Sequence, residues 1–72
     1  MMNIQFQNGA SVSRLYKDGM SEVLAAFQYH SHAQDFASLI AKQDDEAGMN
    51  TVMMVTCHHS GDLAMFGRWA TP

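Results

Sequence analysis

The sequence predicts an α+β fold in which an antiparallel sheet of four to five strands carries one helix on one face, in the order β-β-β-α-β-β. Short turn signals divide the chain into strand-sized segments, and Asn-Gly or Asp-Gly between alternating residues is the strongest short-range indication of a hairpin. One segment, residues 32–46, has helical periodicity instead. With 72 residues, we expect a single domain over residues 1–72. The turn signals are Asn8-Gly9, Asp18-Gly19 and Ser60-Gly61-Asp62.

Alternating polar and apolar residues predict the first strands. Residues 3–7 and 11–16 alternate on either side of the first turn. Residues 20–30 are ambiguous, because their composition suits the start of a helix as well as a strand. We interpret them as a strand, since the preceding Asp-Gly turn gives them a hairpin partner. The residues that then share one face are Val23, Ala25, Phe27 and Tyr29.

A capping signal and a spaced set of apolar residues predict the helix over residues 32–46. Ser31 is the expected N-cap, and Gln34 stands three residues later to complete a capping box. Gly48 is placed to end the helix in a left-handed conformation. The apolar residues at helical spacing are Ala33, Phe36, Ala37 and Ile40.

The predicted strands at residues 51–58 and 63–69 break the alternation of a half-solvated sheet, because apolar residues occupy both faces. One helix covers one face, and an uncovered apolar face is typical of a protein interface. Two alternatives stay open: coiling of the sheet or the N-terminal strand covers the second face, or the register differs. The residues of the predicted strands that are expected to contact a partner are Tyr29, Met54, Phe66 and Trp69.

Three acids, Asp44, Asp45 and Glu46, lie at the C-terminal end of the predicted helix, where the helix dipole favours cations. Either the helix frays after Gln43 into a solvated loop, or the acids contact Lys or Arg side chains of a partner. We include all three in the predicted partner-binding surface. The chain has a net charge of -3 and four Lys and Arg residues, too few to neutralise the phosphates that direct nucleic-acid binding requires.

Cysteine and histidine residues suggest a weaker alternative, a zinc site formed by His30, His32, Cys57 and His59. Their spacing matches no established zinc motif, and the chain has one cysteine. Adjacent strand residues diverge, so Cys57 and His58 do not form a nucleophile and base. We therefore expect no catalytic residues, no enzyme activity and no cofactor.

The lone cysteine and the lack of a cationic leader predict a cytoplasmic protein without a disulfide framework. No segment reaches the roughly 18 apolar residues of a membrane span, so no membrane partner is expected. A chain this short builds a core worth only about 3–5 kcal/mol, which favours a homo-oligomer.

The opening segment from Met2 to Ser13, the strand-helix-strand body and the closing hairpin resemble short accessory proteins of phages and other mobile elements, among them the anti-CRISPR proteins. This resemblance implies an inhibitor that binds a host protein or nucleoprotein complex, in the host cytoplasm. The sequence thus predicts a non-enzymatic protein-binding module. The alternatives are a small nucleic-acid-binding regulator and a zinc-stabilised structural domain.

Overall fold

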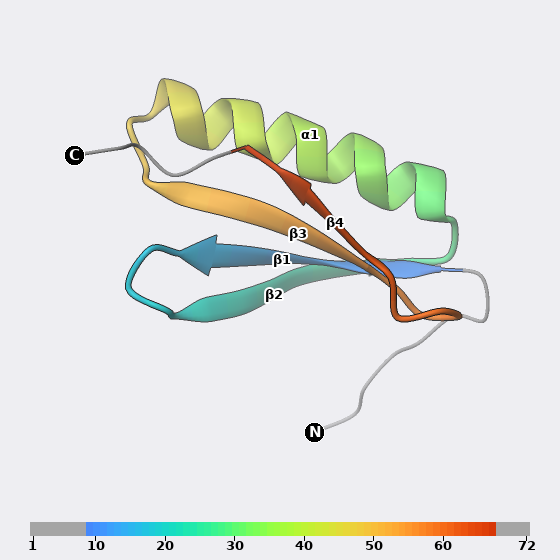
Figure 1. Cartoon of the computed structure of the whole chain (residues 1–72). Coiled ribbons are helices and arrows are strands. Elements are labelled where there is room, and N and C mark those ends of the chain that lie inside the picture. Colours follow the sequence, from blue (N-terminus) through green and yellow to red (C-terminus); the bar gives the residue numbers. More distant parts are fainter. Residues whose placement is uncertain (1–8, 68–72) are drawn as a thin grey trace.

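The computed structural model describes residues 9–67 as one helix packed on a four-stranded antiparallel sheet (Figure 1). The strand order β2-β1-β3-β4 places β1 and β3 in the centre and leaves β2 and β4 at the edges. This confirms the α+β class and the position of the helix between two strand pairs. The elements are β1 (Ala10–Tyr16), β2 (Ser21–Phe27), α1 (His30–Glu46), β3 (Thr51–Cys57) and β4 (Leu63–Phe66). The predicted strand at residues 3–7, Asn8 and Trp69 lie outside the described residues.

Both described turns form at the positions that their sequences predict. In the β1–β2 turn, Gly19 has a φ of 97°, and the Asp18 carboxylate accepts a hydrogen bond of 2.9 Å from the Met20 amide. In the β3–β4 turn, the Gly61 amide donates to the Cys57 carbonyl at 2.8 Å, and Gly61 has a φ of 77°. Glycine tolerates these positive φ angles because it lacks a Cβ atom. Residues 21–27 are accordingly a strand, the second arm of this first hairpin.

The helix begins two residues before the predicted start. Tyr29 is its N-cap, and no side chain hydrogen-bonds to the cap. The amides of His32 and Ala33 instead donate to the Tyr29 carbonyl, at 3.1 and 3.3 Å. The predicted capping box of Ser31 and Gln34 is therefore wrong, because Ser31 already lies inside the first turn.

The helix ends in a Schellman motif built on Gly48, as predicted. Gly48 has a φ of 77°, its amide donates to the Asp45 carbonyl at 3.1 Å, and the Met49 amide donates to the Asp44 carbonyl at 2.9 Å. The helix thus stays regular through Glu46 and does not fray after Gln43. All three acids are therefore held at a fixed helix end.

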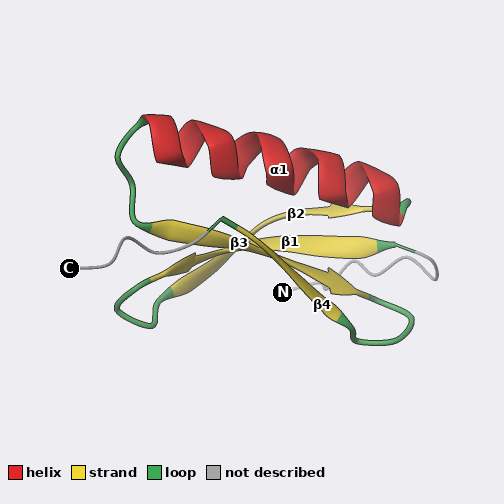
Figure 2. Cartoon of the chain, turned by 45° about the horizontal axis from the view of Figure 1, so that its top comes forward, coloured by secondary structure: helices red, strands yellow, loops and turns green. Residues whose placement is uncertain are grey.

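The core lies between the helix and one face of the sheet (Figure 2). Ala33 and Ala37, which are fully buried, bring the helix close to the two central strands. The Phe36 ring packs against the Phe27 ring with centroids 5.2 Å apart, closing the core above β2. The spacing predicted for the buried side of the helix is confirmed. The fully buried strand residues beneath it are Ala10, Val12, Met53 and Val55.

A β-bulge in β2 changes which residues share a face. Val12 pairs with Ala25, but the next residue of β1, Ser13, pairs with Val23, so Leu24 is an additional residue. Leu24 packs against the core, whereas Val23 is 72% exposed. The prediction that Val23 shares a face with Ala25 is therefore wrong. Tyr29 does not share that face either, because β2 ends at Phe27 and Tyr29 is the N-cap of the helix.

Candidate functional site

The candidate site is the sheet face opposite the helix, hereafter the helix-free face, which no described helix or strand covers (Figure 2). Directly paired residues of neighbouring strands point to the same face, so the register defines its members in three rows across the sheet. The first row is Ala26, Ser11, Thr56 and Leu63; the second is Val23, Ser13, Met54 and Met65; the third is Ser21, Leu15 and Val52.

Exposure on the helix-free face is concentrated at its two edges. Val23 on β2 is 72% exposed, and Leu63 and Met65 on β4 are 60% and 51% exposed. Between them Met54 is half-buried, while Ser13 and Val52 are buried. The exposed apolar side chains of this face therefore lie on its two edge strands, and the central strands contribute partly or fully buried residues.

No residue in the three rows carries a charge, although charged residues occur elsewhere throughout the described chain. When one face of a sheet is in water, that face normally carries charged or strongly polar side chains. Here the polar members are serine and threonine, whose hydroxyl groups are uncharged and can both donate and accept a hydrogen bond. The helix-free face is thus suited to contact with another protein surface.

The predicted contact residues divide between the two faces. Met54 pairs with Met65 on the helix-free face, but Phe66 pairs with Met53 on the core side and packs against the core. Phe66 is therefore not part of the helix-free face. Tyr29 is 55% exposed at the helix start, with its ring edge-on to that of His32 at 5.3 Å.

Sequence reasoning missed the exposed edge residues Val23, Leu63 and Met65 as contact residues. The two on β4 follow from alternation once the register with β3 is known. Val23 depends on the bulge, for which the sequence offers no signal such as a glycine.

Only part of the acidic helix end is exposed. Asp44 is 5% exposed and turns toward the sheet, where its carboxylate accepts hydrogen bonds from the Arg14 guanidinium at 2.9 and 3.0 Å. The Thr51 hydroxyl donates a third bond to the same carboxylate at 2.6 Å. Asp44 is thus satisfied within the chain and leaves the predicted partner-binding surface, whereas Asp45 and Glu46 remain exposed.

Arg14 links the buried carboxylate to the surface. Its guanidinium also bonds the Glu22 carboxylate at 3.1 Å, and the Tyr16 hydroxyl donates to that carboxylate at 2.7 Å. These hydrogen bonds, first that of Tyr16 and then that of Arg14, hold the pKa of Glu22 below its ordinary value. The network ties the C-terminal end of the helix to β1, β2 and β3.

We expect the Glu22 interactions to stabilise the fold at neutral pH and to be lost in acid. Because the folded-state pKa lies below the ordinary value of 4.5, the stabilisation is present above that pH and disappears as the pH falls through the folded value. Thermal melts of wild type and Glu22→Gln should therefore differ at about pH 7 and converge near about pH 2.5. Asp35→Asn, at an exposed helix position, controls for the lost charge. An unchanged difference at both pH values would contradict this assignment.

The cysteine and histidine residues do not assemble a metal site. Among residues 9–67, no group of three or more His, Cys, Asp or Glu side chains is placed to hold a metal ion. His30 and Cys57 do line one open cavity of about 340 Å³, together with Ser60 and Asp62, but His32 and His59 are not part of it. The four residues of the zinc alternative are therefore not gathered at one site in the described chain.

Cys57 and His58 diverge as adjacent strand residues should. The Cys57 backbone pairs with Ala10 on the core side, whereas the His58 ring lies 2.6 Å from the Ser11 hydroxyl, a residue of the helix-free face. Hydrogen bonding to the Ser60 hydroxyl, and to the backbone of Ser60 and His59, lowers the pKa of the Cys57 thiol. His58 is therefore not placed as a base beside the thiol.

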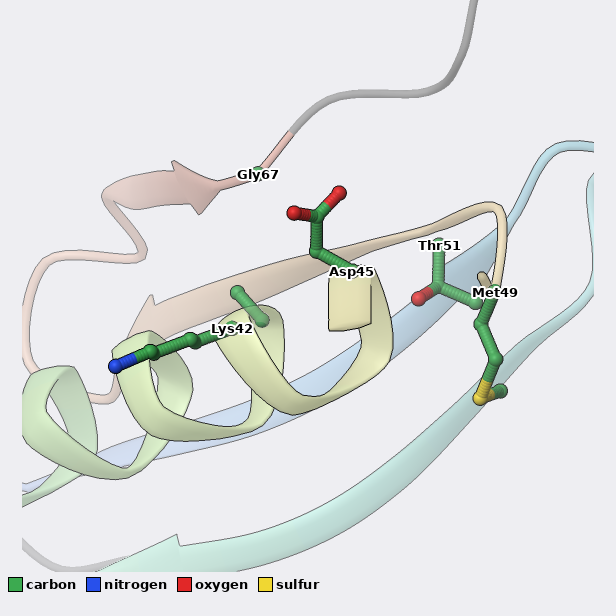
Figure 3. A pocket seen from close by; sticks show the side chains of 6 residues that line it. Lys42, Asp45, Met49, Thr51 and Gly67 are labelled. Carbon is green, nitrogen blue, oxygen red and sulfur yellow. The ribbon is translucent and has the colours of Figure 1, made fainter. Parts of the chain in front are cut away.

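A second open cavity, of about 320 Å³, lies where the end of the helix meets β3 and the residue after β4 (Figure 3). Lys42 and Asp45 are the charged residues among those that line it in the described chain. Their side chains extend in different directions in Figure 3. Met49, Thr51 and Gly67 complete the labelled lining. Charges that diverge in this way do not form an acid–base pair.

Comparisons of the chain with protein-family models, with curated proteins and with solved structures found no match. Within the described part of the chain, the helix is too short and too polar to cross a membrane.

Proposed function

We propose that the protein is a non-enzymatic binding module that contacts another protein through its helix-free face. The observation that carries the proposal is that this face combines exposed Val23, Leu63 and Met65 with a complete absence of charge in its described rows. Apolar side chains left in water cost roughly 25 cal/mol per Å², and a partner removes that cost by covering them.

The acidic helix end supports a second, electrostatic part of the contact. Asp45 and Glu46 are exposed on the last helical turn, whereas the Arg14 guanidinium is bonded to Asp44. The helix lies on the opposite side of the sheet from the helix-free face (Figure 2), so these exposed charges do not line the contact and act on a partner at a distance. Charges of this kind mainly accelerate association with an oppositely charged partner.

The resemblance to phage accessory proteins supports a narrower form of the proposal. In this form the partner is a host protein or nucleoprotein complex in the cytoplasm, and occupation of the helix-free face inhibits it. The low number of cations speaks for contact with the protein component of such a complex and against direct contact with nucleic acid.

Capture experiments with matched variants test the proposal. A tagged chain carrying Val23→Asp and Met65→Asp should recover at least about tenfold less partner from a lysate of the native source than wild type, a loss of about 1.4 kcal/mol or more. Leu39→Asp is the control, because Leu39 is 53% exposed, close to the 51% of Met65, but lies on the helix. Equal recovery by all three proteins, or no recovered protein at all, would refute the proposal.

A further inference from the structure

We draw no further inference here: the strongest candidate, the helix-free face with its exposed edge residues Val23, Leu63 and Met65, is the surface on which the proposed function already rests, and nothing in the structure shows what covers it.

Discussion

Replacing Asp44 by alanine is expected to lower the free energy of unfolding by about 3 kcal/mol, a loss comparable with the whole contribution of a small core. The substitution leaves the Arg14 guanidinium without its buried partner, since the Asp44 carboxylate accepts two of its hydrogen bonds. It also removes the acceptor of the buried Thr51 hydroxyl. The Arg14 side chain retains 20% exposure and the Glu22 contact, which places the effect at the lower end of the range for buried pairs.

Urea denaturation followed by circular dichroism measures this loss of unfolding free energy. Two further variants serve as comparisons. Asp45→Ala changes an exposed acid on the same helical turn and should alter the free energy of unfolding by less than about 0.5 kcal/mol. Replacing the pair together, as Arg14→Met with Asp44→Leu, should recover part of the loss, because it removes both charges at once. If Asp44→Ala and Asp45→Ala are equally stable, the network does not secure the helix end.

Shortening Met53 to alanine is expected to cost about 3 kcal/mol of unfolding free energy. Met53 is fully buried, is among the largest such side chains in the described chain, and lies in the core between the sheet and the helix. The two helix alanines above the sheet are too small to fill the space that the lost thioether leaves. The lost transfer energy and the residual cavity therefore add.

The same urea titration compares Met53→Ala with Met20→Ala. Met20 is 65% exposed and lies between β1 and β2, so its loss should change stability by less than about 0.5 kcal/mol. Since Met20 belongs to neither face of the sheet, this control is independent of any dimer. Similar losses for the two variants would contradict the position of Met53 in the core.

Much of the fold could be predicted from local signals. The Asp18-Gly19 and Ser60-Gly61 turns, the left-handed stop at Gly48 and the buried helix face were all readable, because each depends on residues close together in the chain. The start of the helix could not be predicted, because Tyr29 caps it through backbone hydrogen bonds, which no side chain in the sequence indicates. Residues 1–8 and 68–72, with Trp69, lie outside the described structure.

The sequence predicted that an apolar sheet face would be the candidate site, but it predicted fewer of the residues that form this face. Sequence alternation indicated that one helix leaves an apolar face uncovered, and Met54 was correctly placed there. Phe66 was assigned to a partner surface, but the register of β4 against β3 turns it into the core. Val23 reached the helix-free face only through the β2 bulge.

By itself the sequence determined the class of fold, the positions of its turns and the excess of apolar side chains over what one helix can cover. These depend on backbone preferences and on periodicity within single segments. Only the tertiary structure decided that Asp44 is an internal partner of Arg14, separated from it by 30 positions, and that the described rows of the helix-free face contain no charged residue. Both depend on the register between strands, which sets the face of every side chain and follows from packing of the whole chain.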